Sequence, residues 1–328
     1  MKNFYLKLKL VLLFVVVNIT AFAQYTASIL ETGKLNSAIA RDVSGNIYTT
    51  RFQAADKYEI VKYTNGTGTA TVVYQNIVGN GSDLPYGLAI ASNGDIYFSS
   101  EMASAALGKI TRLNASSSYA ATIVQTGRYF TGLTFDNQNR LYALEYTGSS
   151  YAVVRYSNPG TINSTGTALY SSISSGSGRS YPTSISVATN LTIYCNNVFD
   201  TNELDEEDNG KGGIIKLTTS DSGASYTRTD LNTTNFTSAL YLDEFNNLYA
   251  IETVAPSTKY RLHKYTNGAG TPVQFHNADF ASAYPYLAYG ITAYNNIVYA
   301  IDGDDGVNTG SRLLKLAPTD VTPPSVST

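Results

Sequence analysis

The sequence has very few of the residues from which disulfides, zinc sites and hydrolytic triads are built. Among 328 residues there is one cysteine, Cys195, and there are two histidines, His263 and His276. A single cysteine excludes an intrachain disulfide, and we interpret Cys195 as a small buried hydrophobe rather than a reactive thiol. Both histidines fall in one repeat, away from the site expected below, which disfavours zinc sites and Ser-His-Asp triads.

Charged residues are scarce as well, at 14% of the chain, and the formal net charge is −3. The sequence contains no basic stripe, so nucleic acid is not an expected partner. It also contains no glycine-rich phosphate loop between a strand and a helix. Tryptophan is absent, but the 27 tyrosines and abundant small polar residues are typical of many short strands and turns.

The first 23 residues differ from the rest of the chain. Three lysines precede the apolar run from Leu10 to Val17, and Ala21-Phe22-Ala23 offers a cleavage site. This pattern predicts a secretory signal peptide cleaved after Ala23, and its apolar run is too short for a membrane span. We therefore expect a protein that is secreted to the extracellular space or cell surface, with no membrane span after cleavage.

An apolar residue followed by tyrosine recurs six times after a polar turn. These repeat tyrosines, separated by 45 to 55 residues, are Tyr48, Tyr97, Tyr142, Tyr194, Tyr249 and Tyr299. A small residue followed by Ile or Leu stands nine or ten residues before each one, at Ala38, Gly87, Gly132, Ser184, Ala239 and Gly290. The pattern predicts a first strand with a small residue where space is tight, a turn, and a second strand that carries the tyrosine.

Alternating apolar and basic residues predict a third strand in every repeat. The bases are Lys62, Arg112, Arg155, Lys216, Lys264 and Lys315, which we interpret as solvated and without a functional role. A fourth strand follows in five repeats, whereas the sixth repeat ends after Leu316. The segment YTASIL, residues 25–30, can supply the missing strand, so that no sheet is left unfinished.

The sequence therefore predicts an all-β fold, a six-bladed β-propeller with four-stranded blades over residues 24–318, closed by the N-terminal strand. We expect it to be monomeric, with residues 319–328 as a linker or the start of a further domain. KYTNGTGT at 62–69 and KYTNGAGT at 264–271 are then the third-to-fourth-strand hairpins of the first and fifth blades.

Two stretches resemble repeats of the NHL type: PYGLAIASNGDIYFSSE at 85–101 and TGLTFDNQNRLYALE at 131–145. The resemblance implies the same propeller fold over nearly all of the mature chain. Six-bladed propellers similar to this one include lactonases, in which carboxylates and asparagine hold a divalent metal at the channel mouth, and lyases that use histidine. The scarcity of histidine disfavours the second kind.

Candidate site residues follow from the repeat positions. Three residues after each repeat tyrosine, where the second strand reaches the face of the blade-to-blade loops, stand Arg51, Ser100, Glu145, Asn197, Glu252 and Asp302. The first strands begin from the same face at Ser37, Tyr86, Thr131, Thr183, Ser238 and Tyr289. We expect the channel mouth to bind a ligand through Arg51, Tyr86, Glu145, Asn197, Glu252, Tyr289 and Asp302.

Two interpretations of the acidic positions stay open. Glu145, Asn197, Glu252 and Asp302 supply the oxygen ligands that suit a hard cation such as Ca²⁺. Alternatively, the acids bond to turn amides, and Arg51 neutralises Asp302 without a metal. A longer acidic insertion at 200–213, with Asp205, Glu206, Glu207 and Asp208, could bind Ca²⁺ or a cationic partner, or could simply be solvated.

Three functions are compatible with these patterns. The first is a secreted, non-catalytic binding module that recognises an extracellular protein or glycan through its loop face. The second is an enzyme similar to the metal-dependent lactonases, which would use the carboxylates at the channel mouth. The third is a structural spacer. A metal at the mouth would favour the enzyme, and an exposed aromatic patch beside an empty mouth would favour binding.

Overall fold

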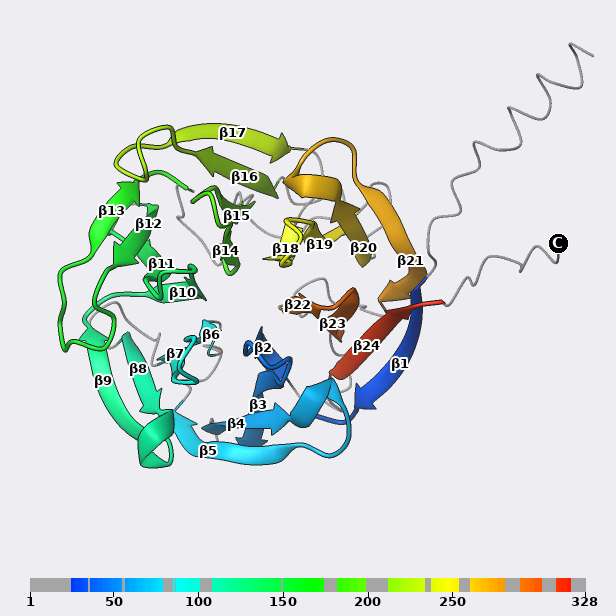
Figure 1. Cartoon of the computed structure of the whole chain (residues 1–328). Coiled ribbons are helices and arrows are strands. Elements are labelled where there is room, and N and C mark those ends of the chain that lie inside the picture. The colour runs from blue at the N-terminus through cyan, green and yellow to red at the C-terminus, as the bar shows by residue number, and fades with distance from the viewer. Residues whose placement is uncertain are drawn as a thin grey trace, which may run out of the picture.

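The computed structural model describes residues 25–319, except 35, 55–56, 79–84, 86, 101–107, 149, 174–181, 199–211, 234–236, 254–259, 281–289 and 303–310. Six four-stranded antiparallel sheets are arranged in a ring around a central axis, as the view in Figure 1 shows. The predicted six-bladed β-propeller is confirmed. In the described part of the chain, helical structure is limited to three short 3-10 turns.

The blades follow one another along the chain. Blade 1 contains β2 (Asn36–Arg41), β3 (Ile47–Ala54), β4 (Lys57–Tyr63) and β5 (Thr71–Val78). Blade 2 contains β6 (Leu88–Ile90), β7 (Ile96–Ser100), β8 (Lys109–Asn114) and β9 (Ala120–Thr126). Blade 3 contains β10 (Phe130–Phe135), β11 (Leu141–Tyr146), β12 (Tyr151–Tyr156) and β13 (Thr167–Tyr170).

The second half repeats this order. Blade 4 contains β14 (Ile185–Val187), β15 (Ile193–Val198), β16 (Gly212–Thr218) and β17 (Thr227–Asn232). Blade 5 contains β18 (Thr237–Leu242), β19 (Leu248–Thr253), β20 (Tyr260–Tyr265) and β21 (Val273–Phe280). Blade 6 contains β22 (Ile291–Tyr294), β23 (Ile297–Asp302), β24 (Arg312–Pro318) and β1 (Tyr25–Glu31). The 3-10 turns are η1 (Thr64–Gly66), η2 (Ala115–Ser117) and η3 (Thr266–Gly268).

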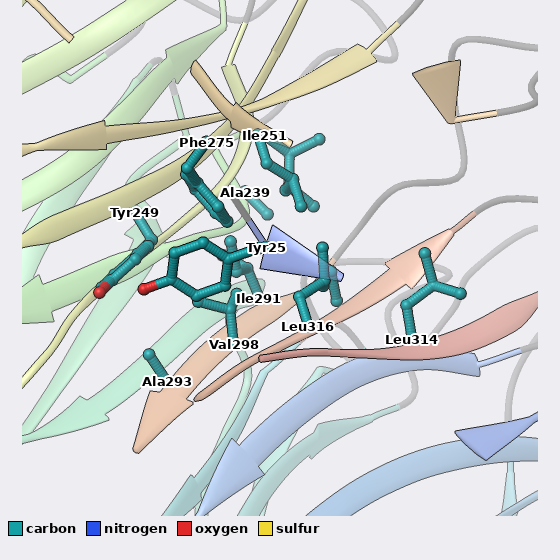
Figure 2. Close-up of a cluster of buried hydrophobic side chains, with 12 residues drawn as sticks. Tyr25, Ala239, Tyr249, Ile251, Phe275, Ile291, Ala293, Val298, Leu314 and Leu316 are labelled. Atoms are coloured by element: carbon teal, nitrogen blue, oxygen red, sulfur yellow. The ribbon is translucent and has the colours of Figure 1, made fainter. Parts of the chain in front are cut away.

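The ring closes in blade 6, where β1 pairs antiparallel with β24 and Tyr25 lies opposite Pro318. The predicted closure by the N-terminal strand is therefore confirmed. Tyr25 anchors the strand: its ring packs edge-on against Phe275 of blade 5, with the ring centres 4.8 Å apart. Figure 2 shows it beside Tyr249 and Leu316 in the core between blades 5 and 6. Burying an aromatic side chain of this kind stabilises the closed ring by several kcal/mol, on the order of 3–5.

The repeat tyrosines make the same cross-strand pair in all six blades. Each lies opposite the basic residue of the third strand, in the pairs Tyr48–Lys62, Tyr97–Arg112, Tyr142–Arg155, Tyr194–Lys216, Tyr249–Lys264 and Tyr299–Lys315. The four lysine ammonium groups lie 5.3–6.0 Å from the ring centres of these tyrosines. The prediction that these bases are merely solvated is therefore wrong: each lysine covers an aromatic ring, Arg112 pairs with Asp95, and Arg155 donates to the carbonyl of Gly223.

The two KYTNG hairpins receive a tyrosine from the preceding blade. The Tyr299 hydroxyl donates to the carbonyl of Gly66 at 3.3 Å, and the Tyr194 hydroxyl donates to the carbonyl of Gly268 at 3.2 Å. Both glycines have positive φ, and a Cβ on either would stand within about 2 Å of the incoming hydroxyl oxygen. The Asn-Gly pair thus provides both the left-handed turn and the space for the neighbouring blade.

The small residues of the first strands are required by the next blade. A Cβ at Gly132 would stand 2.8 Å from the carbonyl oxygen of Thr183, and one at Gly290 would stand 2.6 Å from Ile39. Cys195 is fully buried, and burial raises the pKa of its thiol to about 12, as expected for a core residue. Within the described residues, no helix has the length and apolar character needed to cross a membrane.

Candidate functional site

Antiparallel blades give the propeller two different faces. The loop face carries the connections from second to third strands and from blade to blade. The turn face carries the first-to-second-strand turns and the third-to-fourth-strand hairpins. The candidate residues of the sequence lie where second strands reach the loop face, so the site depends on what each side chain contacts there.

Glu252, near the end of β19, is completely buried and both of its carboxylate oxygens are bonded. Oε1 accepts from Nδ2 of Asn232 at 2.6 Å, from the Tyr265 hydroxyl at 2.8 Å and from the Thr237 hydroxyl at 3.2 Å. Oε2 lies 2.5 Å from Nδ1 of His263. Burial, followed by the charge of Glu252, raises the pKa of Tyr265. This carboxylate therefore ties blade 4, through Asn232, to three groups of blade 5.

Glu145 of β11 has a similar but more open arrangement in blade 3. One oxygen accepts from Nη1 of Arg128, and the other accepts from the Tyr156 hydroxyl at 2.7 Å. The carboxylate is buried, whereas 58% of the Arg128 side chain is exposed. Tyr156 pairs with Leu141, four residues before Glu145, so the two side chains extend toward each other along the blade.

Asp302 ends β23 and is fully buried, but only one of its oxygens is bonded. Oδ2 accepts from Nε of Arg312 at 2.8 Å and also from Nη2 of the same guanidinium, directly across the β23–β24 pair. Oδ1 is buried and has no hydrogen-bond partner among the described residues. Burial raises the pKa of Asp302 to about 6, against the opposing effect of Arg312.

Arg51 does not neutralise Asp302, so that expectation is wrong. Its guanidinium lies 2.6 Å from Oε1 of Glu31 in the closing strand and 2.5 Å from Oε1 of Glu59 in β4. These three side chains are largely buried and join blade 1 to blade 6. Ring closure places Glu31 beside Arg51. The Arg51 guanidinium therefore pairs with Glu31 and Glu59 instead of Asp302.

The other candidates divide into described and undescribed positions. Asn197 is placed by backbone pairing with Gly213, and its side chain is outside the described part, as are Tyr86, Tyr289 and the four acids at 205–208. At the starts of the inner strands, the Ser37 hydroxyl donates to the carbonyl of Pro85 and the Thr183 hydroxyl donates to that of Ser238. These hydroxyls join adjacent blades.

The structure thus surrounds each described acid with its own partners. In the residues that it describes, no three His, Cys, Asp or Glu side chains lie close enough together to hold a metal ion. Of the predicted ligands, Asp302 alone among the described carboxylates has an oxygen without a partner.

His263 contacts the candidate residue Glu252, although the sequence predicted that this histidine would lie away from the site. The register puts Glu252 opposite Arg261 and Ala250 opposite His263, so Glu252 and His263 are diagonal neighbours on one face of the sheet. One sequence signal could have indicated the networks. The residue directly after each third-strand base is alternately tyrosine and leucine, and the tyrosines of blades 3 and 5 are those that bond Glu145 and Glu252.

The comparisons with known proteins give the fold and no family. No protein-family model matches the chain, and no curated protein matches it. Among solved structures, a protein of unknown function from Dyadobacter fermentans superposes with a TM-score of 0.60 at 11% identity, over 90% of this chain and 98% of that one.

Two solved structures with described activities are also similar. A gluconolactonase from Xanthomonas campestris has a TM-score of 0.59 at 11% identity, over 92% of this chain and 93% of its own. The calcium-binding protein regucalcin from Agrobacterium tumefaciens has a TM-score of 0.56 at 11% identity, over 90% and 93%. Similarity at this level of identity establishes a shared β-propeller architecture and leaves function to the site itself.

Proposed function

We propose that the chain is a secreted, non-catalytic binding propeller of NHL-like type that recognises an extracellular protein or glycan through its loop face. A leader cleaved after Ala23 belongs to this proposal, as does a monomeric mature protein. The observation that supports it best is that each of the four carboxylate oxygens of Glu145 and Glu252 already has a partner within the protein. Carboxylates whose oxygens all have partners within the protein stabilise the surrounding strands, and none of these oxygens is left for a ligand alone.

A second candidate is a metal-dependent hydrolase similar to the gluconolactonase. One observation favours it, the bare Oδ1 of buried Asp302, because a buried carboxylate oxygen without a donor is costly and a cation would relieve it. The described donors fit a metal poorly, since Arg312 occupies the other oxygen and, within the described residues, no cluster of carboxylates that could hold a metal includes Asp302. We therefore derive no catalytic step.

A lactone hydrolysis assay separates the two functions. Purified mature protein, incubated with gluconolactone and either Ca²⁺, Mg²⁺, Mn²⁺ or Zn²⁺, should give the uncatalysed rate. Metal-dependent turnover that is lost in Asp302→Asn but retained in the matched variant Asp230→Asn would establish the enzyme and contradict the proposal. Asp230 is a suitable control because it is an exposed acid of the outer strand β17.

Binding itself is tested by immobilising the mature propeller and titrating a panel of extracellular polysaccharides and proteins. The proposal expects saturable binding by at least one member, which is unaffected by chelation. If binding requires an added divalent cation, a metal ion takes part in ligand binding, which would contradict the proposal. If no member binds and the protein is equally inert in the lactonase assay, the spacer interpretation replaces the proposal.

A further inference from the structure

The central channel has a second end, at the turn face, that none of the preceding functions uses. A cavity of about 460 Å³ extends along the channel and is bordered by the inner strands, which Figure 1 shows around the axis. Its lining includes the ends of inner strands and the turns that follow them in blades 1, 2 and 3, together with Tyr241 of blade 5. This volume is within the range of small-molecule sites, about 300–1,000 Å³.

Arg41 breaks the repeat pattern at this end of the channel. In each blade one inner-strand residue pairs with the residue before the repeat tyrosine, and it is apolar in the other five blades: Ile90, Phe135, Val187, Leu242 and Ala293. In blade 1 it is Arg41, opposite Ile47. A local departure from an otherwise consistent repeat is where a functional residue is expected.

The guanidinium of Arg41 is held in place from several sides. Its Nε donates to the Tyr241 hydroxyl at 2.7 Å, and its central carbon lies 5.0 Å from the centre of the Tyr294 ring. Tyr241 is itself an exception, because the residues opposite the other repeat tyrosines are small: Ala40, Ala89, Thr134, Ser186 and Thr292. Tyr241 of blade 5 thus holds the guanidinium of Arg41, which belongs to blade 1 on the other side of blade 6.

Arg41 forms a single ion pair among the described residues. Two acids line the cavity, Asp42 and Asp136, and each already accepts two turn amides and a repeat-tyrosine hydroxyl. Arg41 is the only lysine or arginine among the described lining residues. Its ion pair is with Glu244, through one oxygen at 3.2 Å, and 30% of that side chain is exposed. An anionic ligand would compete with a single, partly solvated carboxylate.

We propose that this end of the channel binds a small carboxylate with an apolar body. The carboxylate would accept a forked pair of hydrogen bonds from Arg41, and the body would lie against the half-buried Ile39, Ile90 and Phe135. This site lies at the opposite end of the channel from the loop face. The proposal is therefore independent of the binding function proposed for the loop face.

Calorimetric titration with benzoate tests the site, with benzamide as the neutral probe of the same shape. Wild type should bind one benzoate, and benzamide should bind at least about tenfold more weakly, which corresponds to about 1.4 kcal/mol. Glu244→Gln removes the competing carboxylate and should strengthen benzoate binding several-fold. Arg41→Met should abolish binding, while Arg112→Met, the loss of a part-buried arginine of blade 2 that pairs with Asp95, should not.

Since Arg41→Met could disturb blade packing, Glu244→Gln is the decisive variant, because it retains the arginine and its tyrosine contacts. The proposal is overturned if neither wild type nor Glu244→Gln binds benzoate at about 10 mM, a concentration that would fill roughly nine-tenths of a site with a Kd of about 1 mM. Equal affinity for benzamide, or unchanged affinity in a folded Arg41→Met protein, would also overturn it.

Discussion

Glu252 and Asp302 occupy the same repeat position in adjacent blades, and their surroundings differ in almost every respect. Both are acidic, both are fully buried and both stand three residues after a repeat tyrosine. Four donors from two blades fill both oxygens of Glu252, whereas Asp302 has a single arginine on one oxygen. An acidic residue at the same repeat position is therefore fully hydrogen-bonded in blade 5 and only partly hydrogen-bonded in blade 6.

The difference has a structural origin in the neighbouring strands. The third strand of blade 5 ends in Tyr265, whose hydroxyl reaches Glu252, while the corresponding residue of blade 6 is the apolar Leu316. Asp302 is also one methylene shorter than Glu252, and it bonds the arginine directly opposite rather than a more distant group. An acid at a repeat position thus predicts a buried charge, and the partners available in each blade decide what that charge does.

The largest expected effect comes from removing the feature unique to blade 6, its strand from the opposite end of the chain. Deletion of residues 25–31 exposes the edge of β24 and removes the Tyr25 ring from Phe275. The protein should lose at least about 3–5 kcal/mol of unfolding free energy or aggregate. Differential scanning calorimetry checks this, with Tyr25→Phe as the control that keeps the ring. An unchanged melting temperature in the deletion would rule out the closure.

Glu252→Ala should be the most damaging single change at the paired acids. It leaves His263, Tyr265 and Asn232 without their acceptor in a buried space, at a cost of about 3–5 kcal/mol in urea unfolding. Glu145→Ala is the matched variant and should cost less, about 1–3 kcal/mol, because the Arg128 that it releases is exposed to water. Equal losses of unfolding free energy in the two variants would show that the Glu252 network contributes no more to stability than the Glu145 network does.

A smaller effect is expected at the contact between blades 4 and 5, where two glycines of one hairpin can be compared. Gly268→Ala places a Cβ 2.2 Å from the Tyr194 hydroxyl oxygen at a φ of +57°, whereas Gly270→Ala meets open space at a φ of +74°. We expect a loss of about 2–3 kcal/mol for the first and about 1 kcal/mol for the second. Adding Tyr194→Phe to Gly268→Ala should recover part of the loss, and a thermal denaturation series in which it recovers none would place the strain elsewhere.

The smallest expected effect is the pH dependence contributed by Asp302. Its pKa in the folded protein is raised to about 6 by burial, so the folded state keeps a proton that the unfolded chain has already lost. Wild-type stability relative to Asp302→Asn should therefore fall as the pH rises from about 4 to about 6, by an amount on the order of 1–2 kcal/mol. Urea unfolding of both proteins at several pH values measures this. A stability difference that does not vary with pH would show that Asp302 stays ionised throughout.

Sequence reasoning predicted the parts of the molecule that the repeat itself determines. Blade number, strand order and the closing strand follow from the spacing of Tyr48 and its five equivalents and from the strand missing after Leu316. The partners of the acids were not predictable in this way. His263 meets Glu252 only because of the β19–β20 register, and Glu31 meets Arg51 only because the ring closes. Such contacts depend on three-dimensional proximity between blades, which periodicity does not encode.

The central claim is that the acids near the loop face bond side chains of the surrounding strands rather than a metal ion, and calcium binding tests it most directly. Metal-free mature protein would be titrated with Ca²⁺ in a calorimeter, and its melting temperature compared in millimolar Ca²⁺ and in chelator. The account predicts no saturable heat and no change in melting temperature. A one-to-one heat of binding with a raised melting temperature, both abolished by Asp302→Asn or by Glu145→Gln combined with Glu252→Gln, would contradict it.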